Sequence, residues 1–158
     1  MANIIPFAFR GELFSGTHNF ANGGDAFKIG LYTSIAGYST SSTVVITTNE
    51  VSSANSSNYE RKALGSQAVA SGTAVASVDF ADSTWANATF TAAGAAIYND
   101  DKSDKLCVVL DFGGNKTATN GTFTVSYPNP STPANAIISL SLIHISEPTR
   151  LLSISYAV

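Results

Sequence analysis

The chain has 158 residues, a length that fits one domain and leaves little room for a second. Hydrophobic residues make up 44% of it, enough for a core, whereas charged residues make up 12%, about half the usual share of a soluble protein. The net charge of −3 and the lack of a lysine and arginine cluster leave no basic footprint for nucleic acid and argue against a membrane surface. We therefore expect a folded domain with a largely uncharged polar surface.

The cysteine content and the first residues bear on the cellular compartment. Cys107 is the single cysteine, so no internal disulfide can form, and its place in the apolar run 106–110 predicts a small buried hydrophobe. No apolar run reaches the ~18 residues of a membrane-spanning helix. The start, MANIIPFAFR, lacks the basic region and long apolar region of a signal peptide. We expect synthesis in a cytoplasm without export by that route.

Residues 6–20 contain the best helix candidate, which we place at about residues 6–15. Phe7, Phe9, Leu13 and Phe14 are interpreted as sharing one face at helical spacing, and Gly16 is a plausible stop. Such a short amphipathic helix needs a surface to lie on. It either offers these side chains to a partner or covers one open end of the domain, and the sequence leaves both interpretations open.

From residue 22 onwards, turn signals separate short runs that alternate or are apolar at strand length. Leu106–Phe112 is apolar on both sides, which predicts a central place in a sheet, and residues 99–104 read as a hairpin tip. The pattern predicts an all-β protein: a single-domain antiparallel β-sandwich or jelly-roll-like fold with one short N-terminal helix, over residues 1–141. The expected strands are Ala26–Thr33, Thr43–Thr48, Tyr59–Leu64 (a short edge strand), Thr73–Phe80, Ala88–Ala92, Ala95–Tyr98, Leu106–Phe112, Thr122–Tyr127 and Ala136–Leu142.

Residues 142–158 differ in character from the rest of the chain. The stretch SLIHISEPTRLLSISYAV resembles the translated read-through of a sequencing adapter. This resemblance implies that the natural chain ends near Leu140 and that His144, Glu147 and Arg150 have no selected role. The alternative is a genuine C-terminal arm with a turn at residues 147–148 and a strand over Leu151–Tyr156.

No arrangement of residues predicts catalysis, and we expect neither an enzyme nor a cofactor. Outside the tail His18 is the single histidine, and no nucleophile elbow accompanies it, so a structural or solvated role is favoured. Asp79 and Asp82 lie at a strand end, where aspartate commonly caps a turn. The acidic segment 99–104 lacks the spacing of an EF-hand loop, so a charged hairpin tip is favoured over a Ca²⁺ site.

Trp85 is the single tryptophan and has two interpretations. Exposed on a β protein, it could stack on a sugar ring or anchor an interface; otherwise it packs in the core or at its rim, which is the interpretation favoured here. Tyr38 and Tyr59 are further aromatic candidates for sugar stacking.

Several segments, taken in order, resemble a family of small bacteriophage virion structural proteins. The resemblance covers most of residues 8–140, and it departs at residues 52–64, where SSANSSNYERKAL replaces the glycine-rich stretch usual after NEV. The segments that carry it are GELFSGTHNF and GGDAFKIGLYTS (11–34), TTNEV (47–51), VDFADSTWANATFTAAGAAIYND (78–100), LCVVLDFGGNKTATNGTFTVSYP (106–128) and NAIISL (135–140).

This resemblance implies a virion component, and the role we expect is a capsid decoration or cement protein that bridges capsomers. The expected partners are the major capsid protein or other virion subunits, together with further copies of the chain in a homo-oligomer. The candidate interface residues are Phe7, Phe9, Leu13, Phe14 and Trp85. The alternative is a tail- or head-fibre module that binds a host-surface glycan. The family supplies no catalytic residues.

Overall fold

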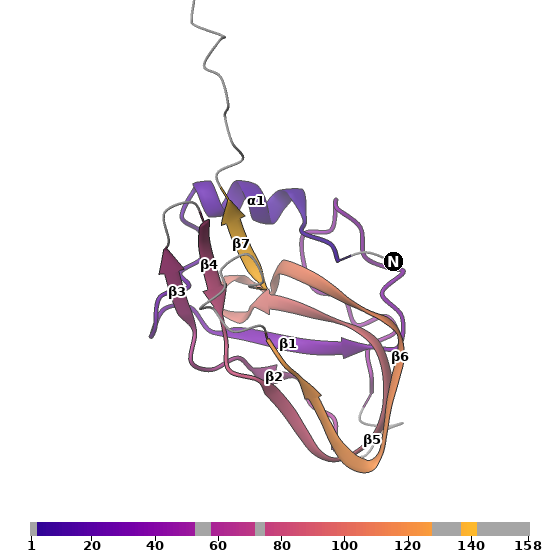
Figure 1. Ribbon diagram of the computed structural model, residues 1–158. Helices are drawn as coiled ribbons and strands as arrows, with labels where there is room; N and C mark the ends of the chain where they lie inside the picture. The colour runs from indigo at the N-terminus through magenta and orange to yellow at the C-terminus, as the bar shows by residue number, and fades with distance from the viewer. Residues whose placement is uncertain (1–2, 53–57, 72–74, 128–136, 142–158) are drawn as a thin grey trace, which may run out of the picture.

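The computed structural model describes residues 3–52, 58–71, 75–127 and 137–141. Their strands form two antiparallel sheets, in the order β2-β1-β5-β6 and β3-β4-β7, and one short helix lies near the N-terminus (Figure 1). The predicted all-β fold with one N-terminal helix is confirmed. The elements are α1 (Phe7–Phe14), β1 (Phe27–Tyr32), β2 (Lys62–Ala63), β3 (Ala68–Ser71), β4 (Val75–Asp79), β5 (Ser83–Asn99), a short 3-10 helix η1 (Asp100–Lys102), β6 (Lys105–Val125) and β7 (Ile138–Ser141).

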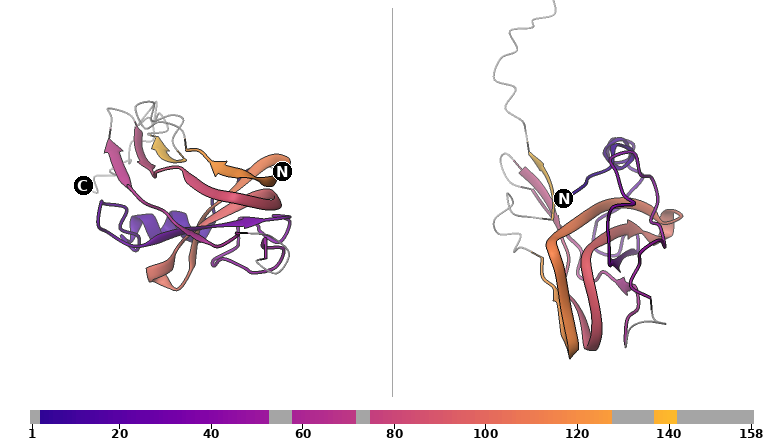
Figure 2. Two further views of the ribbon diagram at one scale, coloured as in Figure 1. Left: turned by 90° about the horizontal axis from the view of Figure 1, so that it is seen from below. Right: turned by 90° about the vertical axis from the view of Figure 1, so that its right-hand side faces the viewer.

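One long hairpin, made of β5 and β6, dominates the fold. Its pairing runs from Asn99 and Lys105 beside the tip to Ser83 and Val125 at the far end, with four register shifts, and the hairpin bends sharply along its length (Figure 2). The prediction of four separate strands in this region was therefore wrong, because the glycines taken as turns lie within the strands. Only the tip, formed by η1 in residues 99–104, matches the expected turn.

Gly94 shows why these glycines bend the hairpin instead of ending its strands. A Cβ atom there would lie 2.4 Å from the carbonyl oxygen of Leu110 and 2.6 Å from Cγ2 of Ile35, so only glycine admits the close approach. The pairing register shifts beside it, between Ala92 and Gly94, and such bulges increase strand bending and twist. Glycine here shapes a continuous strand.

The position of β6 also differs from the prediction. Leu106–Phe112 was expected at the centre of a sheet, but β6 ends the four-strand order. Its outer side is nevertheless covered at this point by two isolated bridges, from Ile4 to Val109 and from Val44 to Lys105. The strand expected over Thr43–Thr48 is reduced to that single bridge, which corrects the prediction and shows that a β-branched run needs a partner edge to become a strand.

The remaining strands follow the sequence pattern with shifted ends. β1 and β4 lie within their expected ranges, and β2 is the short edge strand predicted for Tyr59–Leu64. β7 lies within the range expected for the last strand, whose end at Leu142 falls outside the described residues. β3, with the sequence AVAS, was missed because four small uncharged residues give no clear alternation.

One apolar core joins the helix to both sheets. Phe20 stacks on Phe27 of β1 with ring centroids 4.4 Å apart. Phe80, the residue that follows β4, packs against both of these rings. Val78 of β4 and Ile138 of β7 belong to the same buried cluster. Cys107 is buried with them, as predicted, and burial raises the pKa of its thiol well above the ordinary value. The three-stranded sheet is thus packed onto the main body.

A partly buried ion pair links Glu50 to Arg61. Arg61 donates from Nε and Nη2 to the two carboxylate oxygens of Glu50, each at 2.7 Å, and Tyr59 donates to the same carboxylate at 2.8 Å. The Arg61 guanidinium also lies 5.2 Å from the ring centre of Tyr98. This bidentate pair joins Glu50 to Arg61 beside β1 and β5.

Candidate docking surface

Helix α1 carries two apolar faces on opposite sides. At 3.6 residues per turn, Phe7 and Phe9 point about 160° apart, whereas Phe7 and Phe14 share one side and Phe9 and Leu13 share the other. The structure follows this geometry: Phe9 is 0% exposed, Phe7 is 62% exposed and Phe14 is 93% exposed. The prediction that all four side chains share one face was therefore wrong.

The outward face of α1 consists of Phe7, Arg10, Gly11 and Phe14, and we call it the helix patch. Their spacing of i, i+3, i+4 and i+7 places them on one side of a helix. The Arg10 guanidinium lies 5.5 Å from the ring centre of Phe7, so the cation covers one aromatic ring. A Cβ at Gly11 would meet nothing within 4 Å, which leaves the backbone between the two rings open. The same spacing in the sequence would have identified Arg10 and Gly11, which the sequence analysis missed.

A separate apolar groove lies beside Leu13, on the other side of α1 from the helix patch. It has a volume of about 420 Å³ and runs between Leu13 on α1 and the strands β3, β4 and β7. Val69 of β3 and Leu140 of β7 line it and are 56% and 54% exposed. In Figure 1, α1 and β7 lie together at the top of the molecule. Of the described residues, the large exposed apolar side chains other than Val44 therefore gather on α1 and this sheet.

A polar network beneath α1 anchors the helix to the hairpin. Nε2 of His18 donates to a carboxylate oxygen of Glu12 at 2.9 Å, and the other oxygen of Glu12 accepts from Lys105 of β6. The Asn99 amide nitrogen of β5 donates to Nδ1 of His18 at 2.9 Å and to Asp25 at 2.8 Å. The helix, the following loop and the hairpin end thus share one set of hydrogen bonds.

The directions of these hydrogen bonds assign the proton on His18. The Asn99 amide group has two hydrogens and uses both, one towards Asp25 and one towards Nδ1 of His18. If the Asn99 amide were rotated by 180°, its oxygen would face the Asp25 carboxylate. This is unfavourable because both groups are hydrogen-bond acceptors. In this arrangement Nδ1 accepts from Asn99 and Nε2 donates to Glu12, so His18 links α1 to β5, in agreement with the structural role favoured by the sequence.

The network makes the stability of the helix anchor sensitive to acid. Burial raises the pKa of Glu12, but its contacts with Lys105 and His18 outweigh burial, so the pKa is lowered. Burial also raises the pKa of Asp25, and hydrogen bonds from Asn19 and Asn99 with the charge of Lys102 lower it overall. The stabilisation is thus fully present above the ordinary values of 4.5 and 3.8 and is lost as the pH falls through the lower folded-state values.

We expect the urea concentration at the unfolding midpoint to be nearly constant from about pH 7 to pH 5. Below about pH 5 it should decrease, because the unfolded chain binds more protons than the folded chain in that range. The variant Glu12→Gln should show a shallower fall. Glu60→Gln is the matched control, since Glu60 is largely exposed and pairs with Lys62 on the surface. An acid profile of Glu12→Gln that overlays the wild-type profile would contradict this assignment.

Trp85 lies in the core and not on a surface. It is 1% exposed, its Nε1 donates to the carbonyl oxygen of Glu60 at 2.8 Å, and its ring meets Phe90 and Phe123 edge-on. The packing interpretation favoured by the sequence is thus confirmed. As an interface candidate Trp85 fails, as does Phe9, because neither side chain reaches solvent.

The other aromatic candidates for sugar stacking are also buried. The hydroxyl of Tyr38 accepts from the Ile46 nitrogen at 3.1 Å, and that of Tyr59 accepts from the Leu31 nitrogen at 3.0 Å. Their rings pack inward, so the idea that they present a stacking surface was wrong.

The acidic residues singled out in the sequence hold turns together. Asp82 accepts from the Tyr127 nitrogen at 3.0 Å, and Asp101 accepts from the Ala26 nitrogen at 2.7 Å. Asp100 pairs with Lys28 of β1 at 2.9 Å. In the part of the chain that the structure describes, no three histidine, cysteine or acidic side chains gather as a metal site, and no helix is long and apolar enough to cross a membrane.

Comparisons with protein families, with curated proteins and with solved structures gave no match. The candidate site therefore rests on the geometry of this chain.

Proposed function

We propose that this chain is a structural subunit of a bacteriophage virion, a decoration protein that stabilises the head by bridging neighbouring capsomers. The resemblance in sequence to small virion proteins supports the virion role. The observation that carries the docking role is the helix patch, where Phe7 and Phe14 are 62% and 93% exposed although the same helix buries Phe9 completely. An exposed apolar patch of this kind is typical of an interface.

The size of the helix patch fits a subunit that acts in many copies. A phenylalanine buries about 150–250 Å² at most, so two rings fall well short of the roughly 800 Å² per partner of a standard interface. The groove beside Leu13 lies on the other side of α1, so each contact through the helix patch remains modest. Repeated on a symmetric shell and bridging two capsomers, modest contacts add up through multivalency, and bound copies stabilise the assembled state by mass action.

The test compares purified virions of a phage that carries this gene with virions in which the chain is Phe7→Ser/Phe14→Ser. We expect the wild-type chain on DNA-filled heads in many copies, and occupancy of the double variant reduced about tenfold or more, since losing the burial of one phenylalanine costs about 1.5–3 kcal/mol. Val44→Ser is the matched control, because Val44 is also exposed but lies off α1 and its groove.

Two results would count against the proposal. A chain found in a few copies at the tail tip, or missing from purified particles, would remove the decoration role. Full occupancy by the double variant would remove the helix patch as its docking surface. The alternative of a glycan-binding fibre module has lost its aromatic candidates, since Trp85, Tyr38 and Tyr59 are all buried.

A further inference from the structure

The two halves of β6 differ in what lies along their outer edge. In the first half, Ile4 and Val109 exchange two backbone hydrogen bonds of 2.9 Å, and the Leu106 nitrogen donates to the Thr43 carbonyl at 3.0 Å. From Phe112 to Val125, β5 is the sole described segment that pairs with the β6 backbone. Among the described residues, the second half of β6 is thus an edge whose outer side has no strand partner.

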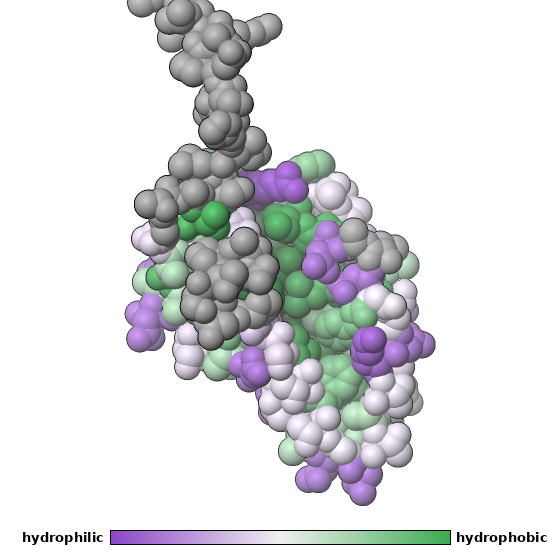
Figure 3. Space-filling model, viewed as in Figure 1, coloured by the Kyte–Doolittle hydropathy of each residue, from purple (hydrophilic) through white to green (hydrophobic). Residues whose placement is uncertain are grey.

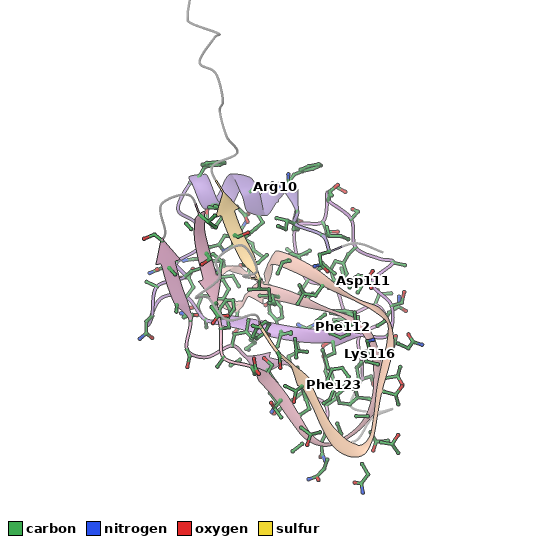
Figure 4. The ribbon with its side chains drawn as sticks, in the orientation of Figure 1. Arg10, Asp111, Phe112, Lys116 and Phe123 are labelled. Atoms are coloured by element: carbon green, nitrogen blue, oxygen red, sulfur yellow. The ribbon has the colours of Figure 1, made fainter. Side chains whose placement is uncertain are left out.

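An apolar hollow accompanies this uncovered edge. It has a volume of about 540 Å³, and Phe112, Ala118, Phe123 and Val125 provide its apolar lining. The rings of Phe112 and Phe123 lie 6.2 Å apart. Figure 3 shows apolar side chains gathered in a hollow at the centre of this face, and Figure 4 shows Phe112 and Phe123 along the bend of β6. The hollow can receive apolar side chains from a strand placed along the edge.

The backbone beside the hollow is open to close approach. A Cβ at Gly113 or Gly114 would meet nothing within 4 Å, and these residues have φ values of +71° and +137°. Gly121, at the other end of the hollow, is nearly as open. Glycine within a strand often marks the place where another backbone approaches.

Lys116 gives the hollow a defined charge. It is the one charged residue of the lining, and it has no hydrogen-bond or ion-pair partner in the described ranges. Figure 4 places it beside Phe112 on β6. A bound segment that offers a carboxylate at this point would complete the pair.

We propose that the second half of β6 binds an extended segment of a different protein, which adds to the sheet edge as a strand, places apolar side chains against Phe112 and Phe123, and offers an acidic side chain to Lys116. Strand addition of this kind takes affinity from backbone hydrogen bonds and specificity from the hollows that receive alternate side chains. The inference does not depend on a role in a virion.

The short strands of a second copy of this chain do not fit as the occupant. The short strands β2, β3 and β7 carry no aspartate or glutamate that could face Lys116. Among the residues outside the described ranges, Glu147 is the one acidic side chain, and residues 128–136 contain three prolines that cannot donate to a ladder. A different protein with an acidic, apolar strand fits better.

The test uses the full chain labelled with ¹⁵N and two synthetic ten-residue peptides. Both alternate valine and threonine, and they differ at one central position, which is glutamate in one and lysine in the other. We expect amide shifts concentrated at residues 112–125, with the glutamate peptide bound about two- to fivefold more tightly, as for an exposed ion pair. A glutamate peptide with alternate N-methylated backbone nitrogens should lose binding, because those groups form the ladder.

Charge reversal provides the matched controls. Lys116→Glu should reverse the preference to the lysine peptide, whereas Arg10→Glu on the helix patch should leave it unchanged. The proposal is overturned if neither peptide shifts these amides at millimolar concentration, if N-methylation makes no difference, or if Lys116→Glu keeps the wild-type preference. Contacts in the free protein between the Phe112 or Phe123 rings and residues 128–136 or 142–158 would overturn it too, because the chain would then fill its own hollow.

Discussion

Replacing Phe9 by alanine is expected to lower the free energy of unfolding by about 3–5 kcal/mol, whereas Phe14→Ala on the same helix should change it by about 0.5 kcal/mol or less. The Phe9 ring is fully buried, 5.2 Å from the His18 ring and 6.1 Å from the Phe20 ring, so alanine leaves a cavity beneath α1. Phe14 is almost fully exposed and has no such packing to lose.

The measurement is urea denaturation of the full chain, followed by the fluorescence of Trp85. Phe9→Leu is the matched control and should fall between the wild type and Phe9→Ala, because leucine keeps part of the apolar contact. Equal losses for Phe9→Ala and Phe14→Ala would contradict the assignment of an inward and an outward face. The pair of variants also separates folding from docking, since Phe14→Ala yields a folded protein with a diminished helix patch.

Trp85→Ala should lower the free energy of unfolding by a similar amount, about 3–5 kcal/mol. The change removes the largest buried side chain of the core, its edge-on contacts with Phe90 and Phe123, and the hydrogen bond to Glu60. Trp85→Phe keeps most of the apolar volume and loses the hydrogen bond, so we expect a smaller loss of about 1–2 kcal/mol.

The stability of both Trp85 variants is measured by thermal unfolding followed by circular dichroism. Tryptophan fluorescence cannot be used, because each variant lacks the single tryptophan. A Trp85→Ala protein as stable as the wild type would contradict the buried position. If that stable protein had also lost binding to a polysaccharide, the glycan-binding interpretation would return. The structure predicts instead that any loss of binding follows from loss of the fold.

The sequence predicted where the apolar segments lie better than how they join. Alternation in the sequence identified β1 and β4, because the period of side chains along a strand is a local property. Burial in the structure does not follow that alternation, since β1 is buried at five of its six positions. The sequence pattern divided β5 at Gly94 and β6 at Gly113, because a glycine that permits a bulge looks the same in sequence as a glycine that permits a turn. The difference lies in a distant neighbour, the carbonyl of Leu110 in the case of Gly94.

The candidate site was predicted in part. The helix was placed correctly to within one residue, and its two apolar faces could have been separated by applying the helical period strictly to Phe7, Phe9 and Phe14. The network of Glu12, His18 and Asn99 could not have been predicted, because Asn99 lies 81 residues from His18 and no local pattern links them. The hollow beside β6 likewise depends on the bend of the hairpin.

The pairing of Glu12 with Lys105, 93 residues further along, has a consequence for how the protein is made. Contacts within the β5–β6 hairpin are local around its tip and can form early, whereas α1 has nothing to pack on until that hairpin exists. On the ribosome, the segment with Phe7, Phe9 and Phe14 therefore emerges before the hairpin and folds after it. We expect chaperones to meet this segment during translation, and α1 to be the last element protected from hydrogen exchange when the chain refolds.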